Sequence, residues 1–260
     1  MLSLLHKLLP FLKLFDKNIP FEKKLLAIVD TAILFYLCIC IAIYFLSPSL
    51  YKEKLYFKNV SIYANDRNFL ENKFFYLSLK KAMKKIESEP IYNKKIQVDL
   101  FFVDSRFIFE LLTFFHDYIG INFFDKIFID KNYVYEDNEN NSSLIYSEIV
   151  HELTHSLQAK RYGGWIKTII AMPNWVKEGY SVYCSRILKF DNNTIKFISG
   201  IQDIYLDDMS ENKKYIVYGL MVKHAIEKMH KSVDDLHLGK VEYDEVLDSL
   251  LREYGVAKGR

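Results

Sequence analysis

The sequence is poor in cysteine, which excludes a fold held together by disulfides. Of its three cysteines, Cys38 and Cys40 lie within a long apolar run, so Cys184 is alone in the rest of the chain. No disulfide framework can be drawn for that part. A lone cysteine is ordinarily a small apolar residue of the interior, so we expect Cys184 to be buried.

The chain also lacks an excess of charge of one sign. Its 260 residues include 35 basic and 33 acidic ones, a formal net charge of +2, and no run of Lys and Arg is interleaved with aromatics. This balance argues against a nucleic-acid-binding protein. Half of the residues are apolar and 26% are charged, which predicts a packed core rather than disorder. We take the scarcity of glycine and proline as a compositional habit rather than a functional signal.

A long apolar run extends from Leu25 to Leu46, with Asp30 as its only charged residue. A helix of this length rises about 33 Å, enough to cross a hydrocarbon core of about 30 Å. No small-residue cleavage pattern follows the run, which argues against a signal peptide. We therefore predict an uncleaved transmembrane helix, and the alternative is a buried core helix.

The lysines on either side of this run indicate how the helix would be oriented in the membrane. More lysines precede the run than follow it, which favours a cytoplasmic N-terminus and an extracytoplasmic main domain. The tail, residues 1–24, is either an amphipathic helix on the membrane surface or a simple apolar tail. Residues 47–53, which include Pro48, are predicted to form a linker. The lysines counted are Lys7, Lys13, Lys17, Lys23 and Lys24 before the run, and Lys52, Lys54 and Lys58 after it.

Strands and helices alternate in the next part of the chain. Residue patterns predict strands over Lys54–Ala64, Lys95–Asp104 and Lys126–Asp137. Helical spacing predicts helices over Asn68–Glu89 and Arg106–Tyr118.

The remainder of the chain is predicted to be helical almost throughout. The segment Asp137–Ser143 is predicted to be a loop, with Ser142 or Ser143 capping the helix that follows. There is no internal repeat and no low-complexity tract. Strands and helices followed by helices alone indicate an α+β domain over residues 54–260.

Two histidines stand four residues apart in the segment Ser147–Gly164, with a glutamate directly after the first. On a helix His151 and His155 share one face, so both imidazoles can point at one metal ion. Glu152 lies about 100° further around the helix, where it misses the ion but reaches a water beside it. This is the physical content of H-E-x-x-H: two neutral nitrogen ligands and a general base. The alternative is an ordinary helix that carries two histidines.

A third ligand is expected from Glu178, in the segment Pro173–Tyr183. It falls in the first turn of a helix predicted to start near Pro173, after a first helix that ends near Gly163. Gly179 would let these two helices approach closely. The alternative for Glu178 is an acidic residue favoured by the helix dipole. Two imidazoles and one carboxylate leave a zinc site with charge +1, which suits a catalytic ion better than a structural one.

HELTH followed by PNWVKEGYSVY resembles the gluzincin metallopeptidases, in particular the peptidase MA-like domains. Their second motif, W-x-x-E-G-x-x-x-Y, matches Trp175, Glu178, Gly179 and Tyr183. Two later segments, KYIVYGLMVKHAIEKM and VEYDEVLDSLLREYG, are similar to a later helix and the closing helix of such domains. The resemblance covers roughly residues 54–254, and only the two metal motifs are specific. The chain departs from thermolysin-type enzymes at Val182, where they place an aspartate.

The resemblance implies a zincin-like fold, a small mixed sheet followed by helices, and a zinc-dependent metallopeptidase with one zinc ion. His151, His155, Glu178 and a water would hold the ion. Glu152 would act as general base on that water, so that peptide bonds are hydrolysed. Together with the predicted transmembrane helix, the resemblance implies a membrane-anchored metallopeptidase that would act on a peptide or protein substrate.

The oxyanion donor is assigned first to Tyr215, which takes the tyrosine position of the later helix, with His224 and Tyr218 as further candidates. The alternative for Tyr215 is an ordinary half-buried tyrosine. In zincins the substrate commonly adds as a strand to the sheet edge, and the strand near Ile127–Tyr135 would serve. The histidines without a motif are expected at the surface or in packing: His116, His230 and His237.

Two other functions compete with the peptidase. The first is a non-catalytic, membrane-tethered binding or assembly module on a zincin scaffold. The presence of all three ligands and the base argues against it. The second is a helical membrane protein with an accidental motif, and the W-x-x-E-G context of Glu178 argues against that.

Overall fold

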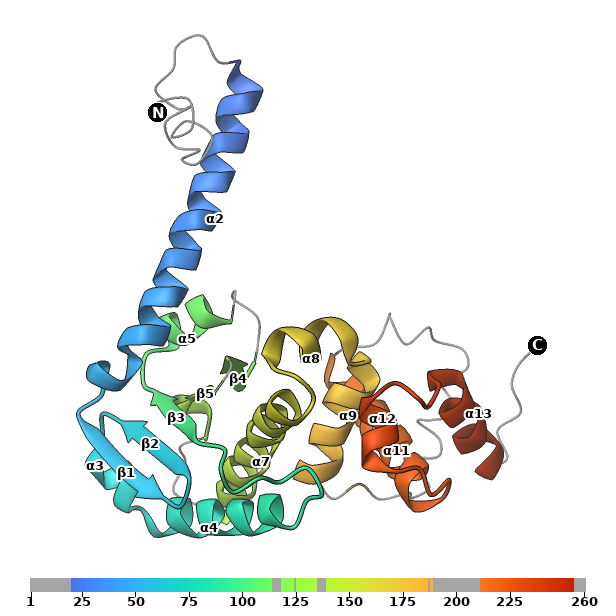
Figure 1. Ribbon diagram of the computed structural model, residues 1–260. Coiled ribbons are helices and arrows are strands. Elements are labelled where there is room, and N and C mark those ends of the chain that lie inside the picture. The colour runs from blue at the N-terminus through green and yellow to red at the C-terminus, as the bar shows by residue number, and fades with distance from the viewer. Residues whose placement is uncertain are drawn as a thin grey trace. The chain divides into compact units, whose positions relative to one another are not determined.

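A computed structural model describes residues 20–113, 118–123, 125–134, 139–186, 188 and 211–254 (Figure 1). The chain divides into two compact units, Met1–Tyr51 and Lys52–Arg260. Most of the predicted tail, residues 1–19, lies outside the described part, as does His116. The architecture is mixed α/β, with a five-stranded sheet and a larger number of helices.

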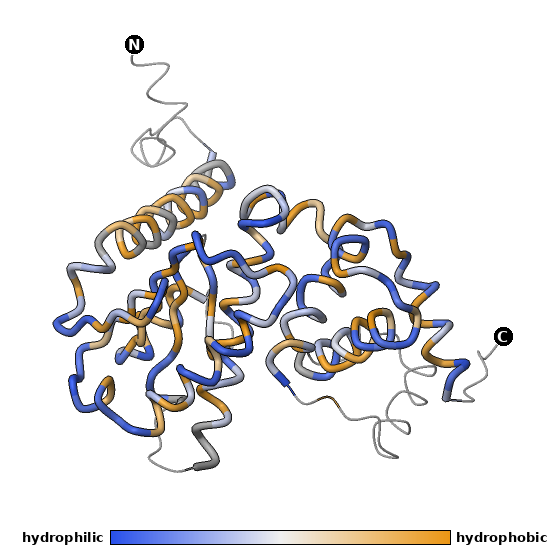
Figure 2. The backbone as a smooth tube through the Cα atoms, turned by 60° about the horizontal axis from the view of Figure 1, so that its bottom comes forward, coloured by the Kyte–Doolittle hydropathy of each residue, from blue (hydrophilic) through white to orange (hydrophobic). Residues whose placement is uncertain are grey.

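The first unit contains α2 (Phe21–Leu46), followed by the 3-10 helix η2 (Ser47–Leu50). The Leu25–Ile43 part of α2 has a mean hydropathy of 2.5, and its hydrophobic residues are coloured orange in Figure 2. By length and composition α2 is a candidate membrane span.

The second unit is built on a mixed sheet with strand order β1-β2-β3-β5-β4. Its outer pairs, β1 with β2 and β4 with β5, are antiparallel, whereas β2 with β3 and β3 with β5 are parallel. The strands are β1 (Glu53–Phe57), β2 (Val60–Ala64), β3 (Val98–Val103), β4 (Gly120–Phe123) and β5 (Lys126–Asp130).

Two predicted elements are each divided into a pair. The strand expected over Lys54–Ala64 is the β1–β2 hairpin, which turns at Lys58 with a φ of 56°. The helix expected over Asn68–Glu89 is α3 (Arg67–Glu71) followed by α4 (Lys73–Glu87). Asn72 separates them because its side chain accepts hydrogen bonds from the first backbone N–H groups of α4, as an N-cap does.

The strand predicted over Lys126–Asp137 is wrong over Lys131–Val134, which form α6, and its last residues, 135–137, lie outside the described part. The Asp130 side chain accepts a hydrogen bond from the backbone N–H of Asn132 and ends the strand.

The loop predicted over Asp137–Ser143 is wrong from Glu139 onward, where α7 (Glu139–Arg161) begins. Ser142 and Ser143 therefore lie inside α7 and do not cap it. The predicted helix from Arg106 is α5 (Arg106–Leu112), whereas β4 was not expected.

The helical half contains α8 (Trp165–Ala171), α9 (Asn174–Ser185), α11 (Glu211–Glu227), α12 (Val233–His237) and α13 (Tyr243–Glu253). Gly163, with a φ of 106°, lies just beyond α7, and confirms the predicted helix end. A Cβ on Gly179 would lie 2.5 Å from the carbonyl oxygen of Tyr218. This glycine thus permits close packing of α9 on α11, whereas the sequence suggested α9 on α7. Cys184 is buried, as predicted.

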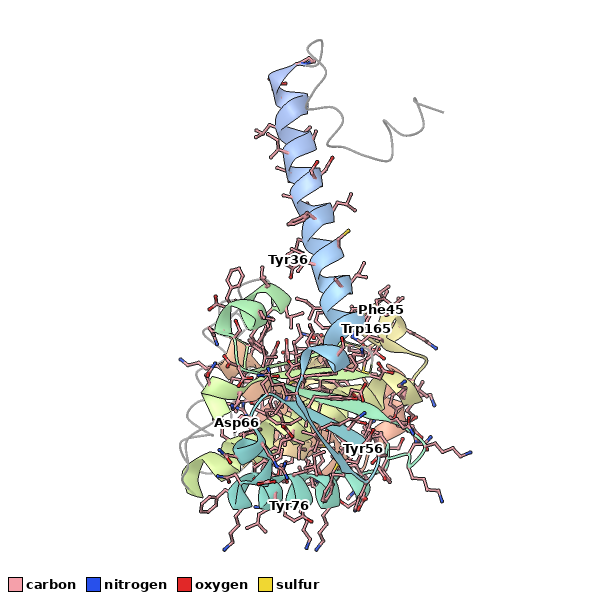
Figure 3. The ribbon with its side chains drawn as sticks, turned by 90° about the vertical axis from the view of Figure 1, so that its left-hand side faces the viewer. Tyr36, Phe45, Tyr56, Asp66, Tyr76 and Trp165 are labelled. Atoms are coloured by element: carbon pink, nitrogen blue, oxygen red, sulfur yellow. The ribbon has the colours of Figure 1, made fainter. Side chains whose placement is uncertain are left out.

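The two faces of the sheet carry different side chains. The core shared with α4, α7, α9 and α11 includes Ile62, Leu100 and Ile127. On the other face an aromatic row starts with Tyr63 and Phe101, whose ring centroids are 4.6 Å apart. Phe128, Phe123 and Trp165 continue the row, with successive centroid distances of 5.0, 6.5 and 6.2 Å. Figures 1 and 3 show α4 on one side of the sheet and α5 and α8 on the other.

Candidate metal centre

The helix α7 is held firmly on the sheet, so the side chains it carries have fixed positions. Ile149 and Val150 are fully buried in the core. On β4, the Asn122 amide donates to the backbone oxygen of Glu152 at 3.3 Å and to Ser156 Oγ at 2.5 Å. A rigid support of this kind is what a metal-ligand pair requires.

His151 and His155 of α7 meet Glu178 of α9 at one point. Their Nε2 atoms are 3.1 Å apart, and Glu178 Oε2 lies 3.6 Å from the first and 3.3 Å from the second. Ligands about 2.1 Å from a tetrahedral zinc ion are about 3.4 Å from one another. The three donor atoms therefore already have the spacing of a zinc site.

The two imidazoles and the Glu178 carboxylate shift one another's pKa values. Burial by itself would lower the pKa of His155, but the charge and hydrogen bond of Glu178 raise it. Burial would raise the pKa of Glu178, but His155 and the hydrogen bonds from both imidazoles hold it well below its usual value. Burial lowers the pKa of His151. A metal ion would compete with the proton of His155 for the same nitrogen.

The orientation of His155 is set through its other ring nitrogen. Nδ1 lies 3.0 Å from Gln158 Oε1 and 3.2 Å from Ser181 Oγ. The Gln158 amide nitrogen donates to the backbone oxygen of Lys177 at 3.0 Å, so its oxygen must face His155. Nδ1 therefore carries a proton, and Nε2 is directed at Glu178. Hydrogen bonds of this kind fix the tautomer of metal-binding histidines.

The hydrogen-bond chain continues to His237 of α12. Its Nε2 lies 3.1 Å from the Gln158 amide nitrogen, and its Nδ1 donates to the backbone oxygen of Val233 at 2.7 Å. Burial lowers the pKa of His237 to about 4, so the ring is neutral and accepts from Gln158. The sequence predicted a surface or packing residue here. His237 is buried, but no motif around it indicated a link to the metal-site helix.

Glu152 lies beside the three donors and against β4. A Cβ on Gly120 would lie 3.0 Å from Glu152 Oε1, so the strand passes close to this carboxyl group. Burial raises the pKa of Glu152 to about 8; His155 opposes the rise, and Glu148 and Glu178 add to it. A group whose pKa lies near neutrality can both take and return a proton. Glu148, a second buried carboxyl group with a pKa raised to about 7 by burial, was not anticipated.

The three possible metal ligands and Glu152 line one cavity of about 410 Å³. Tyr215 of α11 lines it, together with Tyr118, Trp165, Ile169 and Lys177. The structure thus brings the first candidate for the oxyanion donor to the site.

The other two candidates for that donor are not among the residues that line the cavity. His224 is buried with its Nε2 3.0 Å from Ser249 Oγ and its Nδ1 2.9 Å from Glu253 Oε2 of α13. Tyr218 is buried beside Gly179.

The strand beside the metal-site helix differs from the expected one. We expected a sheet edge near Ile127–Tyr135, but β5 lies between β3 and β4. Of the described strands, β4 is the edge strand next to α7, and Gly120, Ile121 and Asn122 all line the cavity.

No family model, curated protein or solved structure matches this chain. The function must therefore be argued from the site itself.

Proposed function

We propose that this protein is a membrane-anchored zinc metallopeptidase with a zincin-like fold. The observation that supports this best is the convergence of two imidazoles and one carboxylate, with Glu152 beside them, in one cavity. His151, His155 and Glu178 would hold a single zinc ion. When bound, zinc would act as a Lewis acid that polarises the scissile carbonyl group and lowers the pKa of a water.

The remaining chemistry falls to the side chains of the chain. Glu152 takes a proton from the attacking water and returns it to the leaving amine. Glu152 is buried and lies against Gly120. Tyr215, which lines the cavity, donates a hydrogen bond to the developing oxyanion. Lys177 Nζ lies 3.3 Å from Glu178 Oε1, which leaves Oε2 for the metal.

The position in the cell is also a proposal. The α2 helix would cross the membrane once, and the lysine bias would place the N-terminus in the cytoplasm and the second unit outside. A tag after Arg260 would then be digested by protease added to intact cells or spheroplasts. Digestion only after the membrane is breached would place the zinc site in the cytoplasm.

The function is tested on the full chain purified in detergent. We expect one zinc ion per chain and turnover of a peptide library, lost with a chelator and restored by added zinc. Zinc without turnover of any peptide or protein would indicate a non-catalytic binding module. Absence of stoichiometric zinc would indicate an accidental motif.

A further inference from the structure

The short helix α8 exposes apolar side chains to the solvent. Ile166, Ile169 and Ile170 are 62%, 48% and 79% exposed, whereas the polar Thr168 is buried. A helix at a protein surface ordinarily has the opposite arrangement, with its apolar stripe turned inward. Clustered exposed apolar residues mark contact surfaces for proteins or membranes.

A second apolar group lies on the same side of the sheet. Phe107 and Ile108 of α5 are 64% and 41% exposed, and Figures 1 and 3 place α5 and α8 on the side away from α4. We name these five residues the apolar rim: Phe107, Ile108, Ile166, Ile169 and Ile170. The solvent-facing side chains of α4, on the opposite side, include four lysines: Lys73, Lys80, Lys81 and Lys84.

The apolar rim borders the candidate active site. Ile169, together with Trp165 and Thr168 of the same helix, lines the cavity that contains His151. Whatever covers the rim therefore also meets the mouth of the cavity.

The distance along the chain indicates what covers it. Helix α2 ends at Leu46, and the second unit begins at Lys52. The residues between them span at most about 20 Å even when fully extended. If α2 crosses a bilayer, as proposed above, the second unit cannot leave the lipid surface. Trp165, which precedes the isoleucines, and Lys167, which lies between Ile166 and Ile169, are residue types that favour the membrane interface.

We propose that the apolar rim rests on the lipid bilayer, so that the cavity opens at the membrane interface. The substrate class is then a polypeptide segment that emerges from the membrane or lies along it. This substrate class rests on the proposed peptidase function, whereas the lipid contact rests only on the proposed membrane span of α2.

The lipid contact is tested without any hydrolysis. The full chain, with Cys38 and Cys40 replaced by alanine, is reconstituted in phosphatidylcholine–phosphatidylglycerol vesicles. Ile170→Cys carries an environment-sensitive fluorophore, and Leu77→Cys is the matched control. Leu77 is 48% exposed on α4, and Figure 3 labels its neighbour Tyr76 on the side of the domain away from Trp165.

We expect spin-labelled lipid to quench the fluorophore at position 170 and not the one at position 77. Equal exposure of both to an aqueous quencher would overturn the lipid contact. Protection from the aqueous quencher without quenching by lipid would also overturn it, and would indicate a second copy of the chain. Protection that appears only after a peptide is added would assign the rim to substrate instead.

The substrate class is tested with two forms of one cleavable peptide, one free in solution and one attached to a transmembrane segment in the same vesicles. The variant I166S/I170S is expected to lower kcat/KM for the attached form about 10-fold, because burial of isoleucine is lost. Cleavage of the free form should be unchanged, and so should both activities of the control Y76S/L77S. An equal effect on both substrates would overturn the substrate class. Turnover of neither form by the unaltered chain would refute the peptidase function, whereas lipid quenching would still support the rim.

Discussion

Helices α7 and α9 bury acidic side chains. The short helix α8 between them does the opposite and exposes apolar side chains. Glu148, Glu152 and Glu178 are buried on the long helices, where a charged group is costly unless it is paired. On α8 it is isoleucine that faces the solvent and threonine that is buried. Both arrangements reverse the usual pattern of globular proteins.

Both reversed arrangements lower the stability of the fold, so each calls for a functional explanation. Buried acidic groups between α7 and α9 make sense if a cation is to be held there. Exposed isoleucines on α8 are expected if something other than water, such as lipid, contacts them in the functional protein. The two reversals lie along one continuous segment of chain, and Glu152, Glu178 and Ile169 line the same cavity. They can be tested separately by changing one helix at a time.

The largest expected effect of any change on α7 is that of Glu152→Gln. The variant keeps the shape of the side chain but loses the general base, so peptide hydrolysis should fall about 10²–10⁴-fold. Zinc content should be unchanged, because the three metal donors remain. Turnover and bound zinc are measured on the same preparation, with Glu71→Gln at the surface as control. Near-normal hydrolysis in Glu152→Gln would exclude the mechanism.

The next largest effect is expected from α9. Glu178→Ala removes the proposed third metal ligand, so zinc affinity measured against a competing chelator should fall more than the 10–100-fold typical of an outer hydrogen-bond partner. If Glu178 were only a favourable acid near a helix start, stability would change by about 0.3–1 kcal/mol and zinc affinity would not. Glu71→Ala, which removes an exposed carboxyl group far along the chain from the site, is the matched control. Unchanged zinc affinity would place the third ligand elsewhere.

The cost of the buried carboxyl groups should appear as a pH dependence at Glu148. Burial raises its pKa from the ordinary 4.5 to about 7, so between these values the folded state binds more protons than the unfolded state. Its stabilising contribution is therefore complete below pH 4.5 and is lost as the pH rises through 7. Glu148→Gln should then stabilise the metal-free protein by about 2–3 kcal/mol at pH 8 and little at pH 4.5.

Denaturant unfolding at the two pH values measures this difference. The same change in unfolding free energy at both would mean that Glu148 does not titrate between them.

The smallest effect concerns the hydrogen-bond chain behind His155. Gln158→Leu removes both the acceptor for Nδ1 and the donor to His237, so zinc affinity should fall about 10–100-fold. His237→Phe keeps the aromatic ring but not the acceptor, while Gln158 still donates to Lys177. Its effect should be smaller. Chelator competition on both variants checks the order, and equal losses would mean that His237 acts on His155 by another route.

Much of the site could be predicted from the sequence because local helix geometry determines it. Four residues make about one helical turn, so His151 and His155 had to share a face once a helix was assumed. The long apolar run could likewise be identified as a candidate membrane span from length and composition alone. Cys184 and the helix end at Gly163 followed from the ordinary behaviour of those residue types.

What the sequence could not provide depends on contacts between distant segments. The four residues of β4 form a strand through pairing with β5, so no periodicity predicts them. Gln158 and His237 are 79 positions apart, and only the tertiary fold brings α12 close enough to α7 for these two side chains to form a hydrogen bond. Gly179 contacts α11 rather than α7 because the crossing of two helices is set by all their side chains together.

The sequence by itself determined which residues could bind a metal, since ligand type and helical spacing are local properties. Tertiary structure decided that Glu178 meets the two histidines at the spacing of a tetrahedral site, that β4 and not β5 borders them, and that α8 turns isoleucine outward. Each of these depends on where helices end and how they pack. Those are properties of the whole chain, because the free energy of burial is shared among side chains far apart in sequence.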